Sequence, residues 1–261
     1  MIDRRNDQAA GLRRLFRKTP PQVMVVYGSG RRGSEHVLHA ARRLSPQSER
    51  VLIIDEAQGE SSLGSLAGQG DGPDLLQLLD GRTMLADVLQ ALPGLFGRIP
   101  AAAAALALPL LDDGRRACLL EALRIFHRHV DVVLIHAEVA TLGQCSPFVA
   151  ATSRRILLAE ASASGASEAY QTVKALAAAG TGSVPVAIGG ARSPEDARAF
   201  YASLNALVHR HVGVPLAFLG EIEHDDLGFN LQRLEEAVAA PGQAFLRNFA
   251  LQPERSHRRS S

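Results

Sequence analysis

Short apolar runs alternate with helix-like segments along most of this 261-residue chain. The run at residues 130–135 is almost continuously apolar, which is typical of a parallel strand buried on both faces. Similar runs predict strands at residues 23–27, 51–55, 95–102, 155–159, 183–188 and 216–219. Helical spacing predicts helices at residues 34–44, 75–79, 85–92, 113–129, 167–179, 194–208 and 227–239, with a loop at 56–74. This alternation predicts a three-layer α/β fold with a doubly wound, mostly parallel sheet.

The chain is expected to divide into four parts. A short amphipathic helix is predicted at residues 1–18, and the proline-containing segment 19–22 is predicted to be a linker because proline cannot continue a helix. The α/β domain is predicted at residues 23–240, and a C-terminal tail at 241–261. Residues 244–251 of that tail are a candidate amphipathic helix. A helix packed on the domain, a frayed helix and a weakly lipid-bound helix remain open alternatives for it.

The composition favours a protein of a reducing compartment. The net charge is +1, so no direct contact with nucleic acid is expected. The chain has only two cysteines, which excludes a disulfide framework and predicts a cytoplasmic location. The longest apolar run, residues 99–111, is shorter than the roughly 20 residues that a membrane span requires. The first 50 residues are strongly basic, which is typical of a contact surface.

A glycine-rich turn, Gly28 to Gly33, lies between the first predicted strand and the helix that follows it. Glycines at this spacing allow backbone N–H groups to surround phosphate oxygens at a helix N-terminus. A complete phosphate-binding loop continues with Lys for the phosphate charge and Ser or Thr for Mg²⁺. Here those positions are Ser34 and Glu35. The turn is therefore either an ordinary strand–helix connection or a phosphate loop without its ammonium group.

The neighbouring strand ends are also poor in ligands for Mg²⁺. Asp55 provides one carboxylate, but His136 stands where such folds usually place an acid. A neutral imidazole is a poor ligand for a hard, oxygen-preferring ion. We therefore expect no ATPase activity, no metal site and no required cofactor. Arg31 and Arg32 keep a residual anion, ATP or ADP site open as an alternative, because guanidinium groups bind phosphate.

Three stretches of the chain resemble a known family. Residues 7–13 (DQAAGLR) match a D-Q-A-x-x-L-R helix, residues 167–174 resemble a tDAYxxiK helix, and residues 215–226 resemble a vLxyLGxIxxD segment. On these residues the chain resembles the MinD/ParA class of deviant P-loop ATPases, and in particular the FlhG/FleN flagellar-number regulators, over about residues 7–230. The resemblance implies a P-loop NTPase-like fold and a cytoplasmic protein. A peripheral position at the inner face of the membrane, near the cell pole, is an alternative.

The departures from the family pattern fall in its nucleotide site. The family loop SGKGGVGKT lines up with residues 27–35, so that its signature lysine becomes Ser29 and its phosphate lysine becomes Ser34. The Mg²⁺ threonine becomes Glu35, and the second acid of a D-x-D stretch becomes Ala57. These departures imply that ATP hydrolysis and ATP-driven dimerisation are lost. The predicted degenerate nucleotide site consists of Gly28, Ser29, Gly30, Arg31, Arg32, Gly33, Ser34, Glu35, Asp55, Ala57 and His136.

The N-terminal helix keeps the family pattern, and the resemblance implies that it binds FlhF, an SRP-type GTPase that places flagella. The predicted partner-binding residues are Asp7, Gln8, Ala9, Leu12 and Arg13. The chain is thus expected to be a non-enzymatic regulator of flagellum number or placement, with weak membrane contact at most. A weak MinD/ParA-type ATPase and an antiactivator that binds a flagellar transcription activator remain alternatives.

Overall fold

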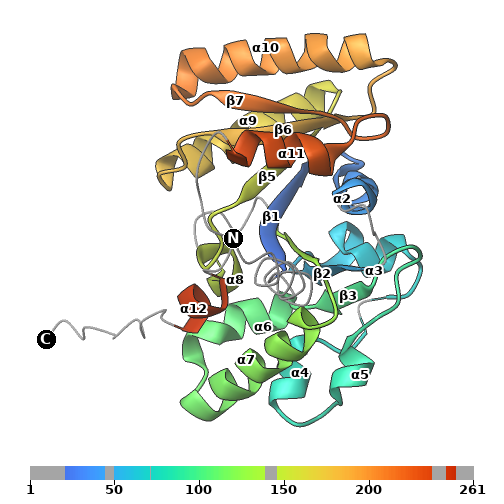
Figure 1. Cartoon of the computed structure of the whole chain (residues 1–261), viewed down its shortest axis with the longest axis vertical. Helices are drawn as coiled ribbons and strands as arrows, with labels where there is room; N and C mark the ends of the chain where they lie inside the picture. Colours follow the sequence, from blue (N-terminus) through green and yellow to red (C-terminus); the bar gives the residue numbers. More distant parts are fainter. Residues whose placement is uncertain (1–20, 45–49, 71, 139–145, 237–244, 251–261) are drawn as a thin grey trace, which may run out of the picture.

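Seven parallel strands form one sheet in the order β3-β2-β4-β1-β5-β6-β7 (Figure 1). The structure is a computed structural model that describes residues 21–44, 50–70, 72–138, 146–236 and 245–250. The strands are β1 Gln22–Ser29, β2 Val51–Asp55, β3 Gly97–Pro100, β4 Val132–His136, β5 Arg155–Glu160, β6 Val184–Gly189 and β7 Leu216–Glu221. The predicted α/β class with a doubly wound parallel sheet is confirmed.

Helices connect successive strands and cover both faces of the sheet (Figure 1). The longer ones are α2 Gly33–Arg43, α7 Asp113–His127, α9 Ala163–Ala178, α10 Pro194–Val212 and α11 Leu227–Glu236. The shorter ones are η2 Gly59–Ser61, α3 Leu63–Leu66, α4 Leu75–Leu79, α5 Leu85–Val88, α6 Ala102–Ala107, η3 Leu108–Leu110, α8 Pro147–Ala150 and α12 Phe245–Ala250.

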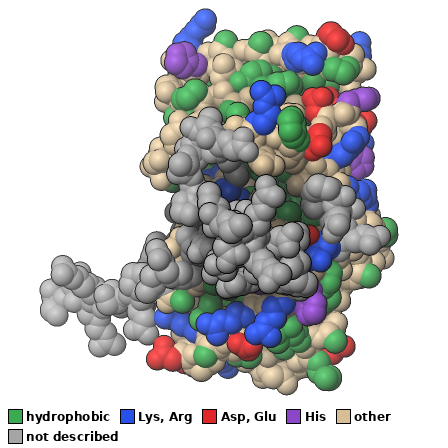
Figure 2. All heavy atoms as spheres, viewed as in Figure 1, with side chains coloured by type: hydrophobic (Ala, Val, Ile, Leu, Met, Phe, Trp, Pro, Cys, Tyr) green, Lys and Arg blue, Asp and Glu red, His purple; other side chains and the backbone are tan. Residues whose placement is uncertain are grey.

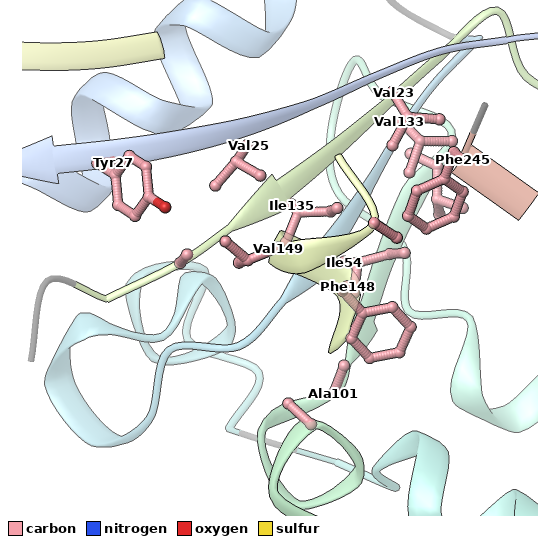
Figure 3. Close-up of a cluster of buried hydrophobic side chains, with 14 of the residues drawn as sticks. Val23, Val25, Tyr27, Ile54, Ala101, Val133, Ile135, Phe148, Val149 and Phe245 are labelled. Carbon is pink, nitrogen blue, oxygen red and sulfur yellow. The ribbon is translucent and has the colours of Figure 1, made fainter. Parts of the chain in front are cut away.

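Alternation along the strands divides the core between the two faces of the sheet. Successive side chains of a strand point to opposite faces, so Met24 and Val26 of β1 lie in one buried cluster and Val25 and Tyr27 in the other. Helices α2, α3 and α11 contribute to the cluster that contains Met24. Helices α4 to α10, together with α12, contribute to the cluster that contains Val25, part of which is drawn in Figure 3.

Several predicted boundaries differ from the structure. The predicted loop 56–74 contains η2 and α3, and the predicted strand 95–102 is limited to Gly97–Pro100. The alanine-rich segment after β3 forms α6, because alanine has the highest helix propensity and Ala104 and Ala105 face the core. Helix α9 begins earlier than predicted, because the Ser162 hydroxyl accepts a hydrogen bond from the Gly165 N–H and caps the helix.

The terminal helix α12 packs on the domain. Phe245 and Phe249 are buried, and the Phe249 ring stacks on Phe148 of α8 with a centroid distance of 5.3 Å. The Phe245 ring stacks on His127 of α7, where burial lowers the pKa of the imidazole to about 4. His127 is therefore uncharged near neutral pH. Of the alternatives that the sequence left open, packing against the domain describes residues 245–250.

The described surface mixes charges of both signs. On the face drawn in Figure 2, Lys and Arg side chains and Asp and Glu side chains occur in both the upper and the lower part of the view. Exposed ion pairs within helices, such as Arg124 with Glu121 and Arg198 with Glu195, place opposite charges side by side. This mixing agrees with the net charge of +1.

Some predicted features lie outside the described residues. The N-terminal helix at 1–18, part of the linker, and residues 237–244 and 251–261 are among them. Among the helices that the structure describes, none combines the length and the apolar character needed to cross a membrane.

Replacing Phe249 tests whether α12 is part of the core. Phe249→Ala should lower the free energy of unfolding by about 3 kcal/mol, because it removes a buried ring and leaves a cavity between aromatic neighbours. Leu106→Ala is the matched control, since this α6 side chain is 69% exposed and its loss should change stability by less than about 0.5 kcal/mol. Urea unfolding followed by circular dichroism gives both values. Equal effects of the two changes would contradict the packing of α12.

Candidate functional site

The candidate site lies at the carboxyl ends of the central strands, where parallel α/β sheets bind their ligands. Strand pairing fixes the arrangement: Asp55 at the end of β2 is opposite His136 at the end of β4, and Gly28 of β1 is opposite Leu158 of β5. The glycine loop runs from β1 into α2 at this edge. The glycine loop, Asp55 and His136 thus lie at the same edge of the sheet.

The glycine loop closes tightly on itself. A Cβ atom on Gly28 would lie 2.7 Å from the carbonyl carbon and oxygen of Gly33, so a side chain there would force the loop apart. Gly30 has a φ of 84°, a conformation that side-chain-bearing residues rarely adopt. The two ends of the loop are therefore in contact, and the backbone forms the narrow turn that the glycine spacing predicted.

Two carboxylates occupy backbone donors of this loop. The Gly30 N–H donates to Glu168 Oε2 of α9 at 2.7 Å, and the Arg32 N–H donates to Glu160 Oε2 at the end of β5 at 3.2 Å. In a phosphate loop such N–H groups would face phosphate oxygens. Sequence reasoning missed both glutamates. Glu160 directly follows the predicted strand 155–159, and Glu168 lies in the motif at 167–174, so their proximity to the loop depended on strand order.

The two positions that carry lysine in related loops hold serines with structural contacts. Ser29 is buried, and its hydroxyl donates to the Gly165 carbonyl at 3.1 Å. The Ser34 hydroxyl donates to the Ser61 carbonyl of η2 at 2.7 Å, which ties the start of α2 to the segment after β2. Neither hydroxyl supplies the positive charge that an ammonium group would give to a phosphate.

Charged side chains of the loop pair with each other. Arg32 Nε lies 2.6 Å from Glu35 Oε2, and this pair is the main reason that the pKa of Arg32 is raised. Glu35 in the first turn of α2 also complements the helix dipole. Arg31 is exposed, and within the described part of the chain it has no ion pair. Of the two arginines that were candidates for phosphate contact, only Arg31 has a guanidinium group outside an ion pair.

Asp55 is the centre of a buried ionic cluster that also contains Arg98 and His136. Asp55 Oδ2 lies 2.9 Å from Arg98 Nη1, and Asp55 Oδ1 lies 2.9 Å from His136 Nδ1. The Asp55 carboxylate also accepts the Leu63 N–H at 2.9 Å and the Ala57 N–H at 3.3 Å. All three ionisable side chains are buried. Both oxygens of Asp55 are thus engaged within the chain, and Ala57 contributes only backbone.

Arg98 comes from β3 and was not identified from the sequence. Its guanidinium group also donates to the Gly70 carbonyl at 2.6 Å and lies 3.4 Å from the Ser62 hydroxyl. Gly64 leaves room for it, because a Cβ atom there would overlap the guanidinium. Arg98 therefore holds the segment between η2 and Gly70 against the strand ends. The sequence placed Arg98 in the predicted strand 95–102 but gave no sign of its ionic role.

Two further ionisable groups lie next to these strand ends. The Ser146 hydroxyl donates to Glu56 Oε1 at 2.5 Å, and burial raises the pKa of Glu56 to about 7. His36 of α2 is buried, and neither of its ring nitrogens has a hydrogen-bond partner among the described residues. Burial, followed by the charge of Arg32, lowers the pKa of His36.

These residues do not fit a magnesium–nucleotide complex. The loop lacks a lysine and its N–H groups face two carboxylates, which would repel phosphate. Within the described ranges, no group of three or more His, Cys, Asp or Glu side chains could hold a metal ion. The predicted partner-binding residues Asp7, Gln8, Ala9, Leu12 and Arg13 lie outside the described residues, so the structure leaves them as a prediction.

The strand order, together with the glycine loop between β1 and α2, defines an α/β protein with a doubly wound parallel sheet and a tight glycine loop at the carboxyl edge of that sheet. The chain is homologous to the antiactivator FleN of Pseudomonas aeruginosa, with 27% identity over 210 residues, or 79% of this chain and 75% of that protein. No family model matches the chain.

Similar solved structures include a chain of the MinC:MinD cell division protein complex of Aquifex aeolicus, at 16% identity and a TM-score of 0.49. That alignment covers 88% of this chain and 94% of the other. The ATP complex of a point variant of McdA from Cyanothece is 18% identical with a TM-score of 0.48, covering 90% and 98% of the two chains.

Removing Arg98 tests the buried ionic cluster. Arg98→Met should lower the free energy of unfolding by about 3–5 kcal/mol, because Asp55 would remain buried without its cation. The control is Arg124→Met, which breaks an exposed pair with Glu121 and should cost less than about 1 kcal/mol. Adding Asp55→Asn to Arg98→Met should recover part of the loss, which a double-mutant cycle in urea measures. Strict additivity would contradict the coupling.

Glu56 predicts a pH dependence of stability. Its pKa is about 7 in the folded chain and 4.5 in its ordinary state, so the folded chain keeps a proton that the unfolded chain loses. Stability should fall as the pH rises from about 4.5 to about 7, by up to about 3 kcal/mol. Glu56→Gln should flatten this part of the profile of unfolding free energy against pH. Asp55 and His136 are the neighbouring charges, and an unchanged profile in Glu56→Gln would contradict the assignment of the dependence to Glu56.

Proposed function

We propose that this chain is a non-enzymatic regulator of flagellum number or placement that acts by binding partner proteins. Its homology to an antiactivator is the observation that carries the proposal. The geometry of the strand-end site supports the same view, because the groups that would bind nucleotide are engaged within the chain. An antiactivator opposes an activator, and binding alone is sufficient for that task.

The loss of ATP turnover is part of the proposal. A P-loop enzyme stabilises the charge that develops on the transferred phosphoryl group with a lysine and a metal ion. Here Ser34 stands at the lysine position and bonds a backbone carbonyl. Glu35 stands at the metal-ligand position, and its charge is directed to Arg32. The Asp55 carboxylate is saturated by Arg98, His136 and two backbone donors.

Two partner classes are proposed. A flagellar transcription activator is favoured by the homology to FleN, whose name describes the opposition to an activator. An SRP-type, FlhF-like GTPase is proposed as a second partner of residues 1–18, on the basis of the motif at residues 7–13. The amphipathic, basic character of that segment suits docking of a helix in a groove.

A weak ATPase of the MinD/ParA type is the alternative from the enzyme class. It would use a guanidinium group in place of lysine, and exposed Arg31 is the better candidate because Arg32 pairs with Glu35. Nucleotide calorimetry with and without Mg²⁺ separates this alternative from the proposal. Turnover that disappears in Arg31→Ala would favour it.

Deleting the gene in the source bacterium tests the proposal. We expect more flagella per cell and higher flagellar transcript levels, counted by electron microscopy and quantitative PCR, because an antiactivator is lost. Ser34→Ala and Glu35→Gln should each restore the wild-type values fully, since neither residue handles nucleotide. Leu12→Asp should restore transcript levels but leave flagella misplaced if residues 1–18 bind the GTPase. Unchanged flagella and transcripts after deletion would refute the function.

A further inference from the structure

The glycine loop has the shape of an anion-binding loop, and side chains of the same chain occupy its donors. We infer that Glu160 and Glu168 act as built-in anions that take the place of phosphate, so that the loop keeps its closed form with no phosphate bound. This inference concerns the regulation of the site, and only its biological consequence rests on the proposed function.

Two glycines leave the space that Glu160 occupies. A Cβ atom on Gly30 would overlap the Glu160 carboxylate, and one on Gly165 would overlap the Glu160 carbonyl oxygen. Glu160 also ends β5, where pairing with Gly189 of β6 fixes its backbone. The carboxylate that receives the Arg32 N–H is thus held by strand pairing and by two positions without side chains. A surface glutamate in chance contact with the loop would not be held in place by strand pairing and by two glycines.

The second carboxylate, that of Glu168, accepts the other loop N–H group. Glu168 lies in the second turn of α9, the helix that begins at Ala163, and its Oε2 accepts the Gly30 N–H. Hydrogen bonds between an ionised acceptor and a backbone N–H are stronger than neutral ones. Both contacts therefore stabilise the same turn with the kind of charge that a phosphate would bring.

The start of α2 retains the features of an anion site beneath these carboxylates. Helix α2 has no side-chain cap on its first turn, so its N-terminal dipole faces the loop. His36 in that turn is 1% exposed and has no hydrogen-bond partner among the described residues. A Cβ atom on Gly190 would lie 3.7 Å from both His36 Nε2 and Glu160 Cγ, so the imidazole and the glutamate border the same corner. An oxyanion in place of Glu160 would find an unused donor there.

Electrostatics explains why the carboxylates exclude phosphate. An oxyanion bound to the Gly30 and Arg32 N–H groups would stand within contact distance of two negative charges, which repel it. The charges of Arg31 and Arg32 do not compensate for both, because Arg32 is paired with Glu35. The loop should therefore remain in one state at any cellular nucleotide concentration. If the proposed function holds, partner binding is independent of nucleotide.

The test is calorimetric titration of the full chain with inorganic phosphate and with ADP. The wild-type chain should show no binding at millimolar ligand. The double variant Glu160→Ala/Glu168→Ala should gain binding of both ligands, with a dissociation constant at least about tenfold below the highest ligand concentration at which the wild-type chain shows none. The matched control is Glu121→Ala/Glu195→Ala, which removes two glutamates from exposed ion pairs elsewhere and should gain nothing.

Further variants keep the inference testable if the double variant fails to fold. Glu160→Gln and Glu168→Gln retain an oxygen acceptor and the side-chain size but remove the charge. Each should bind phosphate more weakly than the double alanine variant, but measurably. Wild-type binding as tight as that of the variants would overturn the inference, as would folded variants that bind no anion. These outcomes are independent of flagellar counts. If the variants gain anion binding but deletion of the gene changes neither flagella nor transcripts, only the proposed function is refuted.

Discussion

The ion pair between Arg98 and Asp55 is the interaction on which the strand-end site depends. It joins the end of β2 to the first half of β3, and through His136 it also holds the end of β4. Because all three side chains are buried, each charge is tolerated only with its partners in place. The same guanidinium group binds the Gly70 carbonyl, so the segment after β2 is fastened to the sheet by the pair that neutralises Asp55.

The Asp55 cluster and the glycine loop are both neutralised by side chains of the chain itself. In a nucleotide-binding protein of this fold, an external cation and an external phosphate would balance the charges at the strand ends. Here Arg98 supplies the positive charge to Asp55, and Glu160 and Glu168 supply negative charge to the glycine loop. The chain thereby pairs Asp55 and two loop N–H groups with charges of its own. This arrangement supports the proposal of a binding function that consumes no nucleotide.

The overall fold was largely predictable from the sequence. Continuous apolar runs identified the strands, and their alternation with helices predicted the parallel sheet, because these patterns follow from local side-chain spacing. The departures were local. Helix α6 was hidden in an alanine-rich run that gives no polar face, and α9 began earlier because Ser162 caps it. The packing of α12 was one of three open alternatives, since its two phenylalanines could face either protein or lipid.

The sequence by itself placed Gly28, Asp55 and His136 at or just after the ends of predicted strands. It also placed Ser34 and Glu35 at the start of the helix after the loop, and it showed that the loop lacks a lysine. It could not identify Arg98, Glu160 or Glu168 as partners of those residues. Arg98 is 43 positions from Asp55, and Glu168 is 138 positions from Gly30. Only the strand order brings them together, because contacts between distant parts of a chain are set by which strands are neighbours. The absence of a lysine was thus readable from residue types, whereas the replacement of external ions by internal charges was decided by the tertiary structure.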